Sequence, residues 1–334
     1  MRQVDYSYDI LRRMISIVWL ILGCLLLWKG GDWLVDGSTS LGIHFNIPKA
    51  VLGLSLVAFG TSAPELIVSI FASLSQKSDI ILGNIIGSNI ANSLLILGIM
   101  ATLTVIRLHS MEIKQEIIIN VLASLCLFLL VVYPLNSLLI LSRGESVIFL
   151  MGFVFFLYML FRTHPKDASY ETSDMLIGHV PESSMRLSRS FLLFLFGTLL
   201  LPMGGYLVVK GATLAALSFS LSESLISLLA VALGTSLPEC VASVIAAFKN
   251  EPEIAVGNVI GSNIFNIFLI LGISGLIRPI EVPSFFMFDV GIVLGISIVI
   301  LLAFLWYKKG VSKKHGFLLL CVYALYVYMT AIRG

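Results

Sequence analysis

Long apolar runs follow one another along almost the whole chain, separated by short polar stretches. A helix needs about 20 mainly apolar residues to cross a bilayer, and ten runs approach or exceed that length. They cover residues 14–44, 47–74, 80–104, 115–133, 136–161, 190–217, 222–249, 254–277, 284–307 and 316–332. The runs are continuous rather than alternating in polarity, which favours helices over the strands of a membrane β-barrel. The pattern predicts an all-α polytopic membrane protein with ten transmembrane helices.

An internal repeat divides these ten runs into two halves. The hexapeptide GTSAPE at 60–65 recurs as GTSLPE at 234–239, and GNIIGSNI at 83–90 recurs as GNVIGSNI at 257–264. The second copy always follows 174 residues after the first. Each half holds five runs, and an odd number of crossings puts the second copy upside down in the membrane. The sequence thus predicts two inverted five-helix repeats, the plan of many secondary transporters.

The one long polar stretch of the chain marks the boundary between the halves. We expect a first repeat at 1–162, a linker at 163–189 and a second, inverted repeat at 190–334. Lysine and arginine are enriched in cytoplasmic loops. With the N-terminus outside, twelve of them lie in cytoplasmic loops and seven on the opposite face, although Arg12 and Arg13 favour the reverse. We therefore expect an integral cell (inner) membrane protein with both termini outside and a cytoplasmic linker.

Composition strengthens the membrane interpretation and isolates two acidic residues. Hydrophobic residues make up 58% of the chain and charged residues 12%, with a mean hydropathy of +1.02, which excludes an ordinary soluble enzyme and a disordered chain. Of 19 acidic residues, only Glu65 and Glu239 lie mid-segment in both copies of the motif. A charge at that depth costs about 2.5–3.5 kcal/mol or more. Because no lysine lies in the same part of the core, a cation site at the repeat interface is favoured over a structural ion pair.

The neighbours of the two glutamates supply further oxygen atoms. Pro64 and Pro238 lack an N–H, so each leaves the carbonyl four residues earlier, at Gly60 and Gly234, without its helical donor. Polar side chains spaced by four residues share a helix face. Four such stripes occur: Thr61, Glu65 and Ser69; Thr235, Glu239 and Ser243; Asn84, Ser88 and Asn92; and Asn258, Ser262 and Asn266. These oxygen ligands, with no thiolate or imidazole among them, suit hard cations such as Na⁺, Ca²⁺ or Mg²⁺.

At these motifs the chain resembles a known family. GTSAPE…GNIIGSNIAN and GTSLPE…GNVIGSNIFN are similar to the paired α-repeats of the sodium/calcium exchanger family, in the calcium:cation antiporter superfamily, and the resemblance to a minimal prokaryotic-type member covers nearly the whole chain. It implies ten helices, four cation positions near the midplane, and alternating access by sliding of the first and sixth segments across a fixed core.

The resemblance also implies roles for individual residues. Glu65 and Glu239 would be shared by Ca²⁺ and Na⁺, and Thr61 and Thr235 would complete the Ca²⁺ position. Three positions would be lined as follows: one Na⁺ by Ser62, Ser88 and the carbonyl of Ala58; its mirror image by Ser236, Ser262 and the carbonyl of Ala232; and the central position by Asn92 and Asn266. Family members often carry an aspartate at one of the last two positions, whereas both are asparagine here. With both glutamates ionised, this core would therefore hold a formal charge of −2, which neutralises one Ca²⁺ or two Na⁺.

The favoured function is a secondary antiporter, not an enzyme, that extrudes Ca²⁺ in exchange for Na⁺ entry. Ca²⁺/H⁺ exchange and K⁺-coupled exchange remain alternatives within the same fold. A passive cation channel is less favoured, because it needs no inverted symmetry around a closed polar core. An intramembrane hydrolase using Ser62 or Ser236 is also less favoured, because it lacks a nearby base. The expected partners are Ca²⁺, Na⁺ and the lipid bilayer, with no nucleic acid and no cofactor beyond the transported ions. A monomer is compatible with the sequence.

Overall fold

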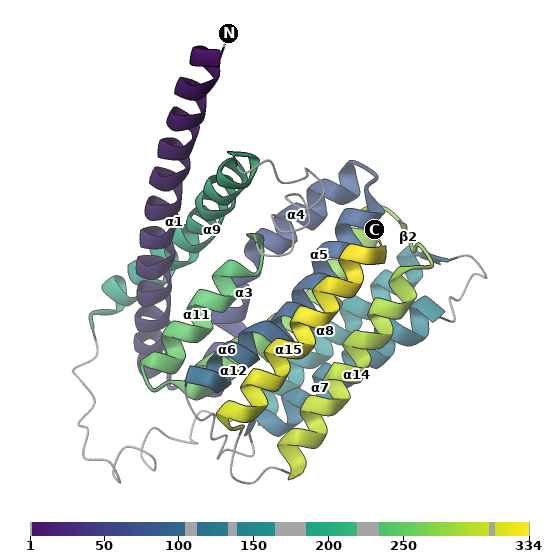
Figure 1. The fold of residues 1–334 in the computed structure, drawn as a ribbon. Coiled ribbons are helices and arrows are strands. Elements are labelled where there is room, and N and C mark those ends of the chain that lie inside the picture. Colours follow the sequence, from purple (N-terminus) through teal and green to yellow (C-terminus); the bar gives the residue numbers. More distant parts are fainter. Residues whose placement is uncertain are drawn as a thin grey trace.

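The described residues of the computed structural model form helices joined by short turns (Figure 1). The structure describes residues 2–103, 112–132, 139–163, 185–218, 234–306 and 311–333, with side chains from residue 14 onward except at residues 112, 163, 216–218, 331 and 333. The helices are α1 (Arg2–Phe45), α2 (Lys49–Leu52), α3 (Ala58–Thr61), α4 (Ala63–Leu74), α5 (Ser78–Ile90), α6 (Leu97–Leu103), α7 (Glu112–Val132), α8 (Arg143–Thr163), α9 (Leu187–Ser218), α11 (Leu237–Phe248), α12 (Pro252–Ile264), α13 (Leu271–Ile277), α14 (Phe286–Trp306) and α15 (Lys313–Arg333). Three π-helical segments lie within longer helices: η1 (Gly53–Val57), η2 (Ala91–Ile96) and η3 (Phe265–Ile270).

Seven of the described helical segments are long and apolar enough to cross a membrane. An eighth is added if Lys49–Thr61 and Ala63–Leu74, which are bent by 46° relative to each other, form one broken span. The helical membrane class is therefore confirmed, whereas the count of ten is not. Residues 219–233, which precede the 12-residue α11, lie outside the described part, and α15 is not among the seven.

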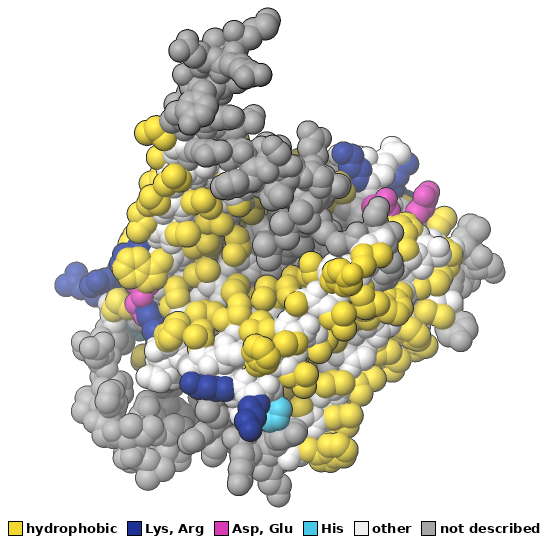
Figure 2. All heavy atoms as spheres, in the orientation of Figure 1, with side chains coloured by type: hydrophobic (Ala, Val, Ile, Leu, Met, Phe, Trp, Pro, Cys, Tyr) yellow, Lys and Arg dark blue, Asp and Glu magenta, His cyan; other side chains and the backbone are white. Residues whose placement is uncertain are grey.

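The outer surface is apolar, as a bilayer requires. Large hydrophobic side chains such as Met151 and Val154 on α8, Val299 on α14 and Phe317 on α15 are between 58% and 66% exposed. Figure 2 shows hydrophobic side chains over most of the visible described surface, with charged side chains in a few small groups. Burial in lipid tails stabilises such side chains because it removes their apolar area from water.

The two longest helices, α1 and α9, are equivalent positions of the two repeats and pack against each other on one side of the molecule (Figure 1). Their backbones approach so closely that a Cβ added at Gly30 would lie 2.9 Å from the Leu201 nitrogen, and one at Gly204 would lie 2.7 Å from the Leu27 nitrogen. Glycines recur every seven residues along both helices, at 23, 30 and 37 and at 197, 204 and 211. Such spacing keeps small residues on one helix face and permits close contact.

The register of this contact shows the inversion of the repeats directly. Residue 23 of α1 lies beside residue 208 of α9, residue 30 beside 201, and residue 37 beside 194. Residue numbers therefore rise along one helix as they fall along the other, so equivalent helices run antiparallel. Equivalent helices α7 and α14 also pack together, and the α8–α13 contact is repeated as α15–α6. These paired contacts fit an internal two-fold axis; the residue bounds given above for the repeats and the linker stay a prediction.

The start of α8 differs from the prediction. The apolar pattern began this segment at residue 136, but residues Ile140–Leu141 form a two-residue strand, β1, antiparallel to β2 (Ile280–Glu281), and the helix begins at Arg143. A capping box fixes that start, because Ser142 Oγ accepts the Glu145 N–H at 3.4 Å and Glu145 Oε2 accepts the Ser142 N–H at 2.6 Å. Residues 133–138 lie outside the described part.

Candidate cation-binding site

Each candidate glutamate lies in the first turn of a helix that follows a break. The helix α3 ends at Thr61, Ser62 has non-helical dihedral angles, and α4 begins at Ala63. Pro64 is tolerated there because N–H groups in the first turn have no acceptor within the helix, so a residue without an N–H loses no hydrogen bond. Glu65 follows it and is fully buried. In the second repeat, Ser236, Pro238 and Glu239 occupy the same places at the start of α11, so both carboxylates lie near the positive end of a helix dipole.

The candidate asparagines also lie at equivalent irregularities. Asn92 is the second residue of η2 and Asn266 is the second residue of η3, and each π-helical segment replaces one turn of an otherwise α-helical span. Such segments are rare and occur frequently at functional sites. Both side chains are fully buried. The apolar pattern predicted these spans but could not reveal the π-helical turns, because the residues in them have ordinary helical preferences.

Hydroxyl groups join the two repeats at the helix breaks. The Ser62 hydroxyl donates to Glu239 Oε1 at 3.0 Å and lies 3.0 Å from Ser262 Oγ. The equivalent contact in the other direction joins Ser236 Oγ to Ser88 Oγ at 3.2 Å, and Thr235 Oγ1 lies 3.5 Å from Ser88 Oγ. The site is therefore formed between the repeats, as expected from their sequence symmetry.

Two further asparagines, Asn84 and Asn258, brace the glutamate helices. Asn84 Nδ2 donates to the Glu65 carbonyl at 3.1 Å and to Ser69 Oγ at 3.0 Å. Asn258 Nδ2 donates to the Glu239 carbonyl at 3.3 Å and to Ser243 Oγ at 2.9 Å. The sequence placed these side chains on the polar stripes, but the four-residue spacing alone could not show that they bind the backbone of the preceding broken helix in the same repeat.

Six buried acceptor atoms of the site have no hydrogen-bond partner among the described residues. They are Glu65 Oε1 and Oε2, Glu239 Oε2, and the Oδ1 atoms of Asn84, Asn92 and Asn266. The Thr235 hydroxyl lies near Glu65, but no hydrogen bond of ordinary geometry reaches either carboxylate oxygen. No ion pair within the described part of the chain involves Glu65 or Glu239. Buried acceptors without donors are costly, and a bound cation would satisfy them.

The other predicted ligands are placed as follows. Thr61 Oγ1 lies 3.0 Å from Asn258 Oδ1 and 3.3 Å from the Ala58 carbonyl oxygen. The Ala58 carbonyl accepts the Ser62 N–H at 2.9 Å, and the single Thr61 O–H proton is shared with the shorter contact to Asn258 Oδ1. Ala232 lies outside the described residues. The assignment of each side chain to a particular ion position stays a prediction.

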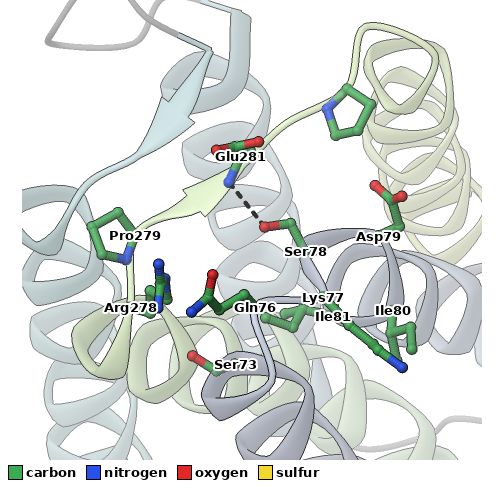
Figure 3. Close-up of a pocket in the computed structure, with 11 residues that line it drawn as sticks. Ser73, Gln76, Lys77, Ser78, Asp79, Ile80, Ile81, Arg278, Pro279 and Glu281 are labelled. Carbon is green, nitrogen blue, oxygen red and sulfur yellow. Dashed lines mark hydrogen bonds between the residues drawn. The ribbon is translucent and has the colours of Figure 1, made fainter.

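A separate charged cavity of about 400 Å³ opens where α4, α5 and α13 end or begin (Figure 3). Charged side chains of both signs line it: Lys77, Asp79, Arg278 and Glu281. Ser73, one of its lining residues, lies eight residues after Glu65, so the polar face of α4 continues from Glu65 through Ser69 to the cavity. In α11 the equivalent face ends in Ala247. The polar face therefore reaches the end of α4 but does not reach the end of α11.

The fold and the site together define a class of protein. Inverted repeats that bring carboxylates, hydroxyls and amides together inside a helical membrane protein are characteristic of secondary transporters for cations. The chain belongs to the sodium/calcium exchanger family, because the model of that family, described as sodium/calcium exchanger protein, matches residues 15–162 and 189–332.

Individual relatives agree with this membership. The chain is 37% identical over 269 residues to the putative antiporter CaxA of Alkalimonas amylolytica, covering 80% of this chain and 82% of that protein. It is 33% identical over 345 residues to the sodium/calcium exchanger MaX1 of Methanosarcina acetivorans, covering 94% and 97%. A solved structure of the sodium–calcium exchanger NCX_Mj soaked with Na⁺ and Sr²⁺ matches with a TM-score of 0.77 and 28% identity, covering 96% of this chain and 99% of that one. The protein is thus an integral membrane antiporter and not an enzyme.

Proposed function

We propose that this protein extrudes Ca²⁺ in exchange for Na⁺ that moves down its gradient, and that the twelve residues named from the sequence resemblance form its ion positions. The observation that carries the proposal is the group of six unpartnered acceptor oxygens around Glu65 and Glu239. Carboxylate and amide oxygens are ligands for hard cations. Two ionised glutamates neutralise one Ca²⁺ or two Na⁺, which supports alternating occupancy of one site by the two ions.

The arrangement of α1 and α9 supports an alternating-access cycle. These helices form one two-helix layer through their glycine contacts, and the layer packs against α11 and the α2–α3 segment beside the helix breaks. Movement of such a layer across a fixed site would expose the ions first to one face and then to the other. We therefore propose that α1 and α9 move together during exchange.

A flux assay separates this function from its alternatives. Purified protein in proteoliposomes should take up Ca²⁺ when an outward Na⁺ gradient is imposed, and an outward K⁺ or H⁺ gradient alone should not drive uptake. Uptake driven by a pH gradient without Na⁺ would instead identify Ca²⁺/H⁺ exchange. Ca²⁺ movement that requires no counter-ion at all would identify a channel.

Labelling from the two faces of the membrane tests the orientation. Single cysteines introduced at Lys166 and Gly334, both outside the described residues, should react with a membrane-impermeant thiol reagent from the cytoplasmic and the external face respectively. The four native cysteines should be replaced first, since all of them are unpaired. Labelling of both positions from the same face would contradict an odd number of crossings per repeat.

Among the described residues, an ion-pair group joins the α1–α9 layer to the core at one end only. Lys249 Nζ, just after α11, lies 2.6 Å from Asp32 Oδ1 and 2.5 Å from Asp36 Oδ1 of α1. The equivalent positions in the other repeat hold Ser75, Tyr206 and Lys210, which cannot form this contact.

Lys249→Met should therefore shift the balance between the two access states. Each of the two partly exposed pairs contributes about 0.2–1 kcal/mol, so we expect a change of about two- to thirtyfold in the ratio of apparent Ca²⁺ affinities measured from the two faces. Lys29→Met is the matched control, because Lys29 contacts Asp32 within α1 alone, at 3.9 Å. Equal ratios in the Lys249 variant and the wild type would contradict this role.

A further inference from the structure

The asparagine of each GSN motif, Asn89 or Asn263, accepts a hydrogen bond from a candidate ion ligand of the opposite repeat. Asn92 Nδ2 donates to Asn263 Oδ1 at 3.1 Å, and Asn266 Nδ2 donates to Asn89 Oδ1 at 2.9 Å. Asn89 and Asn263 are each 2% exposed. The same contact thus occurs twice with the two repeats exchanged, although neither residue belongs to the ligand set expected from the sequence.

These contacts determine which end of the Asn92 and Asn266 amides is free. A carboxamide has a donor end, the NH₂ group, and an acceptor end, the oxygen. Because both NH₂ groups are bound to the neighbouring asparagines, the two Oδ1 atoms remain, and both are buried and unpartnered among the described residues. A rotation of either amide by 180° would exchange its oxygen for an NH₂ group, which repels a cation.

We propose that Asn89 and Asn263 are positioning residues that hold the Asn92 and Asn266 amides with their oxygens toward the transported cation. The inference rests on the proposed function, in which Asn92 and Asn266 flank the central ion position. It adds a reason for the GSN motif in both repeats: an amide ligand is useful for a cation only if its orientation is fixed, whereas a carboxylate has two equivalent oxygens and needs no such partner.

The two positioning residues are not held equally. Asn263 Nδ2 donates to Ser93 Oγ at 2.8 Å, so both ends of the Asn263 amide are engaged. Asn89 Nδ2 has a longer contact, 3.5 Å to the Asn263 carbonyl oxygen, and the residue equivalent to Ser93 is the apolar Ile267. The hydrogen bond from Asn92 to Asn263 is therefore more firmly oriented than the one from Asn266 to Asn89. Asn263 is accordingly the better position to test.

A double-mutant cycle in the purified full-length protein tests the orientation. Equilibrium Ca²⁺ binding would be measured for the wild type, Asn92→Ala, Asn263→Leu, Asn92→Asp and the Asn92→Asp/Asn263→Leu double variant. Asn263→Leu should weaken Ca²⁺ binding about tenfold, because a hydrogen bond that favours the correct amide orientation is lost. In the Asn92→Asp background the same substitution should not weaken Ca²⁺ binding, because a carboxylate cannot be misoriented and the Asn263 oxygen, an acceptor, cannot hydrogen-bond to it.

The outcomes separate this inference from the site on which it rests. If Asn92→Ala leaves Ca²⁺ binding unchanged, Asn92 is not a ligand and the proposed site is wrong. If Asn92→Ala weakens binding but Asn263→Leu has the same effect in both backgrounds, the site stands and the positioning role is overturned, because Asn263 then acts through packing alone. Should Asn263→Leu not fold, as judged by thermal unfolding without Ca²⁺, the less firmly held Asn89→Leu replaces it, with Asn266→Asp as its background and the same two criteria.

Discussion

Glu65→Gln and Glu239→Gln should each abolish Ca²⁺ exchange, lowering flux by at least about 100-fold. Each substitution keeps the shape of the side chain but halves the formal charge of the site. A unit charge about 4 Å from a cation contributes roughly 4 kcal/mol at an effective dielectric constant of 20, before desolvation is subtracted. Na⁺-driven Ca²⁺ uptake into proteoliposomes, normalised to the amount of folded protein, measures the effect.

A matched control for these variants is Glu145→Gln. Glu145 is also fully buried, but it caps α8 and does not belong to the site. Glutamine can replace glutamate in a capping box, so this variant should keep its exchange activity. Undiminished flux in either Glu65→Gln or Glu239→Gln would show that the two carboxylates do not bind the transported Ca²⁺.

Asn266→Asp should change the ions that the site binds, and so the reversal potential of exchange in liposomes. The substitution places a third carboxylate beside Glu65 and Glu239, giving a formal charge of −3 where the native site has −2. An additional monovalent cation can then be neutralised in the Na⁺-bound state. The hydrogen-bond partner can adapt, because rotation of the Asn89 amide would let its NH₂ group donate to the new carboxylate.

The control for this variant is another buried asparagine. Asn120 of α7 is 1% exposed and donates to Ser297 of α14 at 3.3 Å, outside the candidate site. Asn120→Asp should lower stability through the cost of a buried charge and leave the reversal potential unchanged. If Asn266→Asp behaves in the same way, with normal flux and an unchanged reversal potential, Asn266 holds helices together and does not bind ions.

The helix start at Arg143 illustrates where pattern analysis fails. The apolar run from residue 136 resembles a continuation of the helix, and only the pairing of β1 with β2 shows that Ile140 and Leu141 are extended. That pairing joins residues about 140 positions apart in the chain, so no local pattern predicts it. The Ser142–Glu145 capping box was visible in the sequence as S-R-G-E and could have corrected the boundary.

The sequence alone determined the membrane class and the internal repeat, and it singled out two glutamates as candidate ion ligands. Bilayer thickness sets the length of apolar runs, a constant 174-residue shift is independent of any structure, and the cost of a charge at membrane depth marks Glu65 and Glu239. Only the tertiary structure decided how the amides of the site are oriented. Asn89 and Asn263 belong to the repeated motif but lie off the polar stripes, and their role arises from hydrogen bonds across about 170 residues of chain. An amide presents a donor or an acceptor according to its neighbours, and those neighbours are brought together only when the two inverted repeats pack.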